Sequence, residues 1–241
     1  MSRSRPEHDA GDSLSLETEV LPDADAAATR GADIIAARIA AVAPGQRFAI
    51  AISGGATPWK MFAALAAHPE IPWDAVDIWQ ADERIAPAGH DDRCLTHQAQ
   101  SLPPQAFARL RPMPVDDLEG ANDAVMSAAA DRYSATLPAT FDLVHLGLGE
   151  DGHTASLLPG DVAADVRDKN VAISGEYKGR RRMTLTFPVL DHALFALWIV
   201  TGADKARVLR KFRDGDSMLP AAHVNARERV VIADAAAATR L

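Results

Sequence analysis

Apolar residues occur along this chain in short, nearly continuous runs. The clearest run is FDLVHLGL at 141–148, and such continuity is typical of a parallel strand that helices cover on both faces. Similar runs predict further strands at 47–52, 75–79, 171–174, 182–187, 194–201 and 228–233.

Helical patterns lie between several of these strands. The first helix is expected to begin after Asp23, which is a suitable N-cap, and to reach Val42, because Pro44-Gly45 would stop it there. Alternating strands and helices predict an α/β fold with three layers: a doubly wound, mainly parallel sheet with helices on both faces.

The chain has 241 residues, of which 48% are hydrophobic and 24% charged, so its length and composition fit one globular domain. Residues 1–16 mix polar and charged residues without periodicity, and we interpret them as a disordered tail. Residues 17–241 are expected to form the single domain, since no repeat or long linker divides them.

A formal net charge of -8 argues against a nucleic-acid partner, because such proteins need a basic face. The single cysteine, Cys94, excludes an internal disulfide, and the opening MSRSRPEHDAGD lacks the apolar segment of a secretory signal. No apolar stretch approaches the about 20 residues that a membrane span needs. We therefore expect a cytoplasmic protein without a membrane partner, either a monomer or a small homo-oligomer.

The glycine-rich segment after the strand at 141–148 holds the candidates for catalysis. Ligands of parallel sheets bind beyond the carboxyl ends of the strands, and Gly152 belongs to a turn that allows close backbone approach. His153 is the candidate base, because a neutral histidine accepts a proton from water near neutral pH. Asp151 is its candidate orienting partner, and Thr154 is expected to cap a following helix.

A second glycine-rich segment, SGGATP at 53–58, follows the strand at 47–52 and precedes a helix. Thr57 is a candidate cap, and Pro58 suits the first turn. Free N–H groups at such a helix start favour a phosphate. Ser53, Gly54, Gly55 and Thr57 are therefore candidate substrate-binding residues.

Charged residues follow the strand at 75–79 as Asp82-Glu83-Arg84 and should emerge at the carboxyl edge of the sheet, with a salt-bridged, solvated turn as the alternative. No metal is expected, because Glu150, Asp151 and His153 are crowded into one loop and no H-E-x-x-H occurs. There is no G-x-S-x-G segment for a serine nucleophile either. Direct attack by water is the simpler mechanism.

Five segments occur in the order and spacing of a known family: SGGATP, DERIAP, GLGEDGHTASLLPG, RMTLTFPVL and TGADKA. Together they resemble the 6-phosphogluconolactonases, a family that shares its fold with glucosamine-6-phosphate deaminases. The resemblance implies hydrolysis of 6-phospho-D-glucono-1,5-lactone to 6-phospho-D-gluconate in the oxidative pentose phosphate pathway, without a cofactor. The partner would be a small phosphorylated sugar lactone.

The same resemblance implies roles for the basic residues. Arg84 would contact the substrate while Asp82 and Glu83 orient it or neighbouring backbone. Arg182 and Lys205 would face the sugar phosphate. Backbone N–H groups of the glycine turn, or Arg84, would stabilise the oxyanion. One departure is Arg93-Cys94, where family members often carry Ser-Asn, and Cys94 is expected to be a small buried residue outside the chemistry.

Two alternatives stay open from the sequence. The first is a deaminase or isomerase of the related fold, although deaminases typically continue the glycine-Asp-Gly-His segment with I-A-F-N-E-P, where this chain has Thr154-Ala155-Ser156-Leu157-Leu158. The second is a non-catalytic sugar-phosphate sensor. Such regulators usually carry a helix-turn-helix, for which the short amino-terminal segment has no room.

Overall fold

Seven parallel strands form the central sheet of the computed structural model, which describes residues 16–241. The predicted α/β class is confirmed. The predicted tail, apart from Leu16, lies outside the described residues. Across the sheet the strands are β1 (Glu17–Leu21), β10 (Glu228–Asp234), β9 (Phe195–Val200), β6 (Leu143–Leu146), β2 (Phe48–Ile52), β3 (Val76–Gln80) and β5 (Leu110–Arg111).

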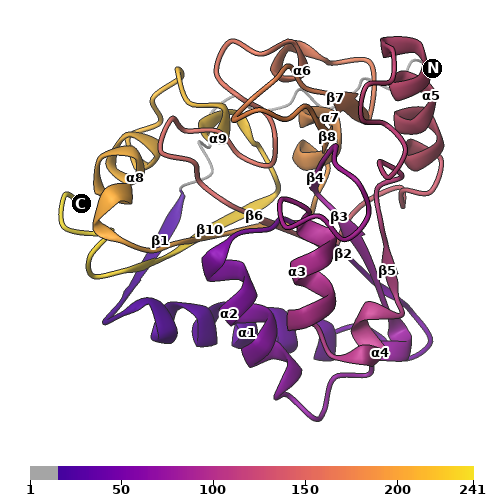
Figure 1. Ribbon diagram of the computed structural model, residues 1–241. Coiled ribbons are helices and arrows are strands. Elements are labelled where there is room, and N and C mark those ends of the chain that lie inside the picture. Colours follow the sequence, from indigo (N-terminus) through magenta and orange to yellow (C-terminus); the bar gives the residue numbers. More distant parts are fainter. Residues whose placement is uncertain (1–15) are drawn as a thin grey trace, which may run out of the picture.

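Helices cover both faces of this sheet (Figure 1). One face packs against α1 (Ala24–Ala40) and α2 (Ala56–Ala66), and the other against α5 (Asp123–Ser134) and α8 (Ala206–Arg213). The three layers therefore agree with the prediction from alternating strands and helices.

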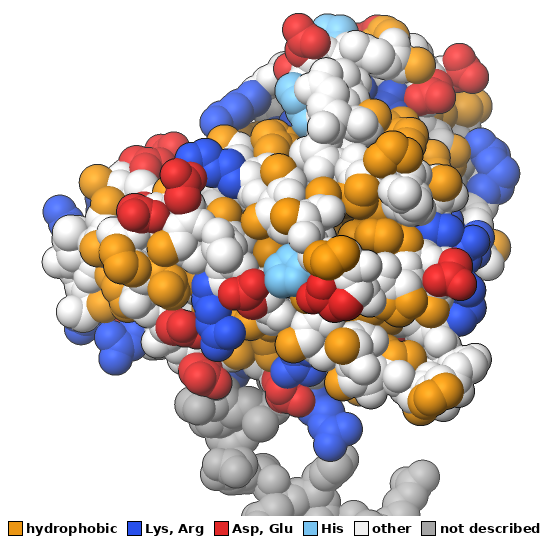
Figure 2. All heavy atoms as spheres, turned by 90° about the horizontal axis from the view of Figure 1, so that it is seen from below, with side chains coloured by type: hydrophobic (Ala, Val, Ile, Leu, Met, Phe, Trp, Pro, Cys, Tyr) orange, Lys and Arg blue, Asp and Glu red, His pale blue; other side chains and the backbone are white. Residues whose placement is uncertain are grey.

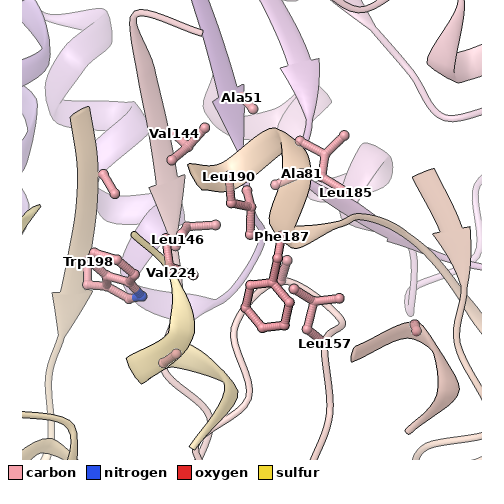
Figure 3. Packing of buried hydrophobic residues seen from close by; sticks show 14 of the residues in the cluster. Ala51, Ala81, Val144, Leu146, Leu157, Leu185, Phe187, Leu190, Trp198 and Val224 are labelled. Atoms are coloured by element: carbon pink, nitrogen blue, oxygen red, sulfur yellow. The ribbon is translucent and has the colours of Figure 1, made fainter. Parts of the chain in front are cut away.

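Strand β9 shows why the sheet needs two helical layers. Phe195, Leu197 and Ile199 belong to the core on the side of α1 and α2. The alternate residues, among them Trp198, belong to the second core, where Trp198 lies near Leu146 and Val224 (Figure 3). Because neighbouring side chains of a strand point to opposite faces, a continuous apolar run is stable only when both faces are covered.

Helix α1 begins as the sequence predicts. The Asp23 carboxylate accepts a hydrogen bond from the Ala26 N–H at 2.8 Å, which caps the helix. The helix ends at Ala40, however, and the predicted end at Val42 is two residues too late.

A second, smaller sheet contains three antiparallel strands: β4 (Asp82–Arg84), β8 (Arg182–Leu185) and β7 (Val171–Ile173). Residues 82–84 are therefore a strand rather than the solvated turn that was the alternative for them, and the sequence did not predict this strand. These residues pair with β8, with Asp82 opposite Thr184 and Arg84 opposite Arg182. The strands predicted at 171–174 and 182–187 exist, but they belong to this sheet rather than to the parallel one.

The helix predicted after Thr154 does not form. The Thr154 hydroxyl donates to the Gly147 carbonyl at 2.9 Å and accepts from Trp198 Nε1 at 3.2 Å, so it is not free to cap a helix. Ala155 has a φ of 47°, in the left-handed region, which is incompatible with an α-helical turn. The next helix, α6 (Val162–Asp165), begins after Asp161, whose side chain caps it.

Short elements complete the described chain. They are the 3₁₀ helices η1 (Trp73–Ala75) and η2 (Ala203–Lys205) and the helices α3 (Cys94–Ser101), α4 (Pro104–Phe107), α7 (Phe187–Asp191) and α9 (Pro220–His223). Within residues 16–241, no helix combines the length and apolarity needed to cross a bilayer. On the face shown in Figure 2, acidic and basic side chains are interspersed rather than gathered by sign.

Strand order reverses between β2 and β6. From β2 the chain proceeds outward through β3 to β5, whereas β6 is followed by β9 and β10 on the other side. The loops that leave β2 and β6 therefore diverge at the carboxyl edge of the sheet. In open α/β sheets such a reversal is where ligands bind.

Candidate active site

A cavity of about 830 Å³ opens at this reversal, between the segments that follow β2, β6 and β9. Its size is ample for a sugar phosphate. Strands β4 and β8 of the small sheet also contribute to its wall. All predicted site residues except Gly152 line it: Ser53, Gly54, Gly55, Thr57, Asp82, Arg84, Asp151, His153, Arg182 and Lys205.

Two glycines shape the turn after β6. A Cβ atom on Gly149 would lie 2.1 Å from His153 Nδ1, so only glycine lets the imidazole lie against this backbone. Gly152 has a φ of 88°, and a Cβ there would lie 2.3 Å from Leu219 Cδ2. Gly152 therefore packs against Leu219, the residue before α9. It shapes the turn but does not line the cavity.

His153 and Asp151 form a close pair on the cavity wall. Their contact joins His153 Nδ1 and Asp151 Oδ1 at 2.6 Å, and the same carboxylate oxygen accepts from the His153 backbone N–H at 3.1 Å. Hydrogen bonding to His153 is the largest reason that the pKa of Asp151 lies well below its usual range. Asp151 therefore remains a carboxylate at neutral pH and favours the tautomer with the proton on Nδ1.

Helix α2 presents an uncapped N-terminus to the cavity. Its N-cap residue is Gly55, with a φ of 135° and no side-chain cap. Thr57 is therefore not the cap that the sequence suggested: its hydroxyl bonds to that of Thr201 at 2.6 Å. Pro58 lies in the first turn, as predicted. The buried Ser53 hydroxyl has no protein partner, which leaves it available to a ligand.

Arg84 and Arg182 stand opposite each other on neighbouring strands. Arg84 Nη1 donates to the Asp92 carbonyl at 2.7 Å, and the Nε groups of both arginines lack protein partners. Burial lowers the pKa of Arg182, and the charge of Arg84 acts in the same direction. Like charges on facing strand positions destabilise a sheet, so an anion between these guanidinium groups would relieve repulsion.

Lys205 reaches the cavity from the segment after β9. Its Nζ lies 3.9 Å from the Asp204 carboxylate, and its side chain is 22% exposed. Thr201, which bonds to Thr57, lies four residues earlier on the same connection. The starts of α2 and η2 therefore meet at this end of the cavity, which brings together two of the predicted phosphate contacts, the α2 N-terminus and Lys205.

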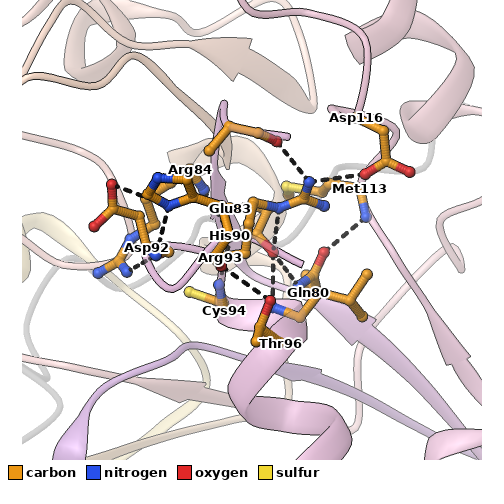
Figure 4. A network of polar contacts seen from close by, with 12 residues as sticks. Gln80, Glu83, Arg84, His90, Asp92, Arg93, Cys94, Thr96, Met113 and Asp116 are labelled. Atoms are coloured by element: carbon orange, nitrogen blue, oxygen red, sulfur yellow. Dashed lines mark hydrogen bonds and ion pairs between the residues drawn. The ribbon is translucent and has the colours of Figure 1, made fainter. Parts of the chain in front are cut away.

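Glu83 organises the backbone behind Arg84 (Figure 4). Its fully buried carboxylate accepts from the Cys94 N–H at 2.7 Å and the Leu95 N–H at 2.8 Å, at the start of α3. Arg93 Nε lies 3.3 Å from it. The carboxylate of Glu83, in β4, thus accepts hydrogen bonds from N–H groups that have no partner within α3. It therefore links α3 to β4 and holds the backbone beside Arg84 in place.

The Arg93-Cys94 departure has a structural explanation. Arg93 is 1% exposed and donates to the Ala86 carbonyl and the Asp116 carboxylate, each at 2.8 Å. Burial raises the pKa of the Cys94 thiol well above its ordinary value, so the thiol stays protonated at neutral pH. Neither residue lines the cavity.

Two cavity-related residues were not predicted. The Ser156 hydroxyl donates to Asp82 Oδ2 at 2.7 Å, and the Ser156 N–H donates to Thr184 Oγ1 at 3.1 Å, which joins the turn after β6 to the small sheet. Tyr177 lines the cavity with its ring centroid 5.4 Å from that of His153. Ser156 lies within a recognised segment, whereas nothing local marks Tyr177, which depends on the β7–β8 hairpin.

Among the residues that the structure describes, no group of three or more His, Cys, Asp or Glu side chains is placed to hold a metal ion. Glu150, Asp151 and His153 all line the cavity, but Asp151 is hydrogen-bonded to His153 rather than directed with it at a common point. The arrangement fits an acid–base pair with cationic groups around it.

The chain is similar to known proteins of one family. Residues 22–232 match the family described as glucosamine-6-phosphate isomerases/6-phosphogluconolactonase. A 6-phosphogluconolactonase of Nostoc sp. is 32% identical over 209 residues, which cover 81% of this chain and 84% of that protein.

Solved structures share the fold. A 6-phosphogluconolactonase from Leishmania guyanensis superposes with a TM-score of 0.81 at 23% identity, covering 92% of this chain and 97% of that one. A monomeric glucosamine-6-phosphate deaminase superposes with a TM-score of 0.80 at 16% identity, covering 94% and 100%. At these identities the fold is common to both enzymes, so the fold alone does not choose between them.

Proposed function

We propose that this chain, which belongs to the family of glucosamine-6-phosphate isomerases and 6-phosphogluconolactonases, hydrolyses 6-phospho-D-glucono-1,5-lactone to 6-phospho-D-gluconate. This reaction belongs to the oxidative pentose phosphate pathway. The observation that carries the proposal is the His153–Asp151 pair, with 2.6 Å between Nδ1 and Oδ1, on the wall of a cavity lined by cations and a helix N-terminus. Lactone hydrolysis needs both activated water and an anion site.

His153 acts as the general base. Since Asp151 engages Nδ1, Nε2 is the ring nitrogen that accepts a proton from water. The resulting hydroxide adds to C1 of the lactone, and the carbonyl oxygen becomes an oxyanion. The intermediate then collapses by breaking the bond between C1 and the ring oxygen, which leaves as a hydroxyl with the proton from the imidazolium. Asp151 stabilises that cation throughout.

Arg84 is the favoured oxyanion donor. The sequence left two choices, Arg84 and the glycine-turn amides, but the Gly149 N–H donates to the His153 carbonyl and the Gly152 N–H to the Gly149 carbonyl, each at 2.9 Å. The Arg84 Nε–H has no protein partner. A preorganised charged donor in a partly buried site stabilises developing negative charge strongly.

The phosphate binds to the α2 N-terminus with Arg182 and Lys205. Ser53, Gly54, Gly55 and Thr57 supply the loop, the planar guanidinium of Arg182 suits two phosphate oxygens, and Lys205 supplies a compact charge. Asp82 holds Arg182 in place through Ser156, whose hydroxyl lies 3.5 Å from Arg182 Nη1 and 2.7 Å from Asp82 Oδ2.

The decisive experiment offers freshly prepared 6-phosphogluconolactone to the purified protein and couples product to 6-phosphogluconate dehydrogenase. Formation of 6-phosphogluconate above the rate of spontaneous opening is expected. Glucosamine 6-phosphate is offered in parallel, and ammonia release is measured. Ammonia without lactone hydrolysis would replace the proposal with the deaminase alternative, and tight binding of 6-phosphogluconate with neither activity would replace it with the sensor alternative.

The biological setting belongs to the same proposal. We place the protein in the cytoplasm, with residues 17–241 as one domain. We assign it no nucleic-acid partner, because its formal net charge is -8. It would be a monomer or a small homo-oligomer, which light scattering coupled to size-exclusion chromatography would decide. Binding to duplex DNA at moderate salt would contradict the partner assignment.

A further inference from the structure

The connection between β7 and β8 is a tight hairpin whose tip reaches the cavity. The Tyr177 N–H donates to the Arg180 carbonyl at 2.9 Å, and the Arg180 N–H donates to the Tyr177 carbonyl at 3.3 Å. Between them, Lys178 and Gly179 have φ values of 51° and 78°. Two successive positive φ values are typical of a type I′ turn, which fixes the direction of its flanking residues. Tyr177 is therefore held at a defined place on the cavity wall.

The Tyr177 ring contacts both the proposed base, His153, and a proposed phosphate ligand, Arg182. It meets the His153 imidazole edge to face, with 5.4 Å between the ring centroids and 70° between the planes. Aromatic pairs favour this geometry. The Arg182 guanidinium carbon lies 5.0 Å from the Tyr177 ring centroid, within the range of a cation–π contact. The ring thus adjoins both the proposed base and a proposed phosphate ligand.

The Tyr177 hydroxyl also acts on the carboxylate that orients the base. Tyr177 contributes to the low pKa of Asp151, after the larger effect of His153. Burial raises the pKa of Tyr177, and the Asp151 charge acts in the same direction, so the hydroxyl remains a donor at neutral pH. Asp151 is therefore hydrogen-bonded to His153 and is also influenced by the Tyr177 hydroxyl.

This restraint matters because His153 lies on a turn rather than within a strand. Its side chain is 19% exposed, and Gly149, against which the imidazole lies, has no side chain to hold it. A base on such a turn has to be held by neighbouring side chains, since a displacement of about 1 Å can cost a rate factor of about 100.

We propose that Tyr177 is a positioning residue, which holds the Asp151–His153 pair in the orientation that activates water. The inference rests on the proposed function for its kinetic consequence. The ring restrains the imidazole and the hydroxyl restrains the carboxylate, so the two contributions are separable by substitution.

The test compares Tyr177→Phe and Tyr177→Leu with Glu176→Gln, a control at an exposed neighbouring position that does not line the cavity. Tyr177→Phe keeps the ring and should lower kcat about tenfold, as expected when a hydroxyl that acts on the Asp151 carboxylate is removed. Tyr177→Leu should lower kcat by about a hundredfold. The inhibition constant of 6-phosphogluconate should stay near the wild-type value in Tyr177→Phe, and Glu176→Gln should match the wild type.

A second readout needs no substrate. The His153 Nδ1 proton, shifted downfield by its bond to Asp151, should be visible in the NMR spectrum of the wild type and of Glu176→Gln. It should broaden or vanish in Tyr177→Leu while the unfolding temperature is retained. His153→Ala assigns the signal.

The outcomes separate the two proposals. A wild type without lactonase activity, whose Nδ1 proton is nevertheless lost in Tyr177→Leu, would reject the function and retain the positioning role. An active wild type with unchanged kcat and an unchanged proton signal in both Tyr177 variants would reject the positioning role alone. Equal losses in kcat and product affinity, with a lower unfolding temperature, would also reject it in favour of a purely structural contribution.

Discussion

The two sheets contribute to the cavity in different ways. Every residue of β6 and of β9 is buried, and the parallel sheet reaches the cavity mainly through the segments that follow its strands. The small antiparallel sheet contributes strand residues themselves, namely Asp82, Arg84 and Arg182. Strands β4 and β8 carry charged residues, whereas β6 and β9 consist mostly of apolar residues.

This difference separates two requirements of the proposed reaction. The base lies on a glycine turn, where a side chain can be oriented by neighbours, as His153 is by Asp151. The side chains of Arg84 and Arg182 extend from the paired strands β4 and β8. The register of this pairing places the two arginines opposite each other before a ligand binds. We infer that changes in the turn affect the chemical step most, whereas a change of Arg182 in β8 affects use of the phosphate.

The largest effect is expected from the turn. His153→Ala removes the general base, and such assistance is typically worth about 10² to 10⁴-fold, so kcat should fall within that range. Asp151→Asn should act in the same direction. Affinity for 6-phosphogluconate, measured by calorimetry, should stay near the wild-type value, because the phosphate contacts are intact.

His68→Ala is a matched control, because His68 lies beside Asp33 and Glu70 and does not line the cavity. The wild-type kcat/KM should also fall at acidic pH, since a protonated imidazole accepts no proton. A His153→Ala protein that keeps wild-type kcat and the same acidic limb would assign the base to another residue.

The next effect is expected from the cations around the phosphate. Arg182→Ala and Lys205→Ala should each lower kcat/KM for the phosphorylated lactone at least about tenfold, since a charge-assisted hydrogen bond is worth about 1.5 to 3 kcal/mol. Gluconolactone without phosphate should be a poor substrate whose hydrolysis changes little in either variant.

Arg181→Ala is the control for Arg182→Ala, because Arg181 donates to Asp123 at 2.6 Å and does not line the cavity. If all three variants used the phosphorylated lactone as well as the wild type, Arg182 and Lys205 would have no part in phosphate binding.

The same contrast explains what the sequence could predict. The apolar runs of β2, β6 and β9 are determined locally, because burial on both faces demands them, and their positions were predicted to within a few residues. Strand β4 consists of Asp82, Glu83 and Arg84 and exists through pairing with β8. No local pattern reveals such a strand. The two-residue strand β5 and the edge strand β1 were also missed.

The candidate site shows the same division. Residues within recognised segments, such as Ser53 and His153, line the cavity. Tyr177 was missed because its contact with His153 depends on the hairpin between β7 and β8. The helix expected at Thr154 failed because tertiary partners, Gly147 and Trp198, take the side chain that would have capped it.

A smaller effect, on stability, is expected from His145 in the parallel sheet. Burial lowers its pKa to about 3, against about 6.5 in an unfolded chain. Between these values the unfolded state binds the extra proton, so the free energy of unfolding falls as pH decreases, by up to about 1.4 kcal/mol per pH unit. Urea unfolding at several pH values should show this slope reduced in His145→Leu. An unchanged slope in that variant would assign the acid sensitivity to other groups.

The smallest effect is expected from Cys94, the first residue of α3, which does not line the cavity. Its Sγ would lie 2.5 Å from a Cβ atom on Gly54, so the thiol packs directly under the glycine loop that follows β2. A raised pKa keeps it protonated, and a neutral buried thiol is a weak nucleophile. Cys94→Ser, which is nearly isosteric, should therefore retain most of kcat/KM, with a modest loss of stability from burying a hydroxyl. Steady-state kinetics and thermal unfolding on the same preparation measure the two effects separately. Loss of turnover in a folded Cys94→Ser protein, or alkylation of Cys94 that substrate blocks, would place the thiol in the chemistry after all.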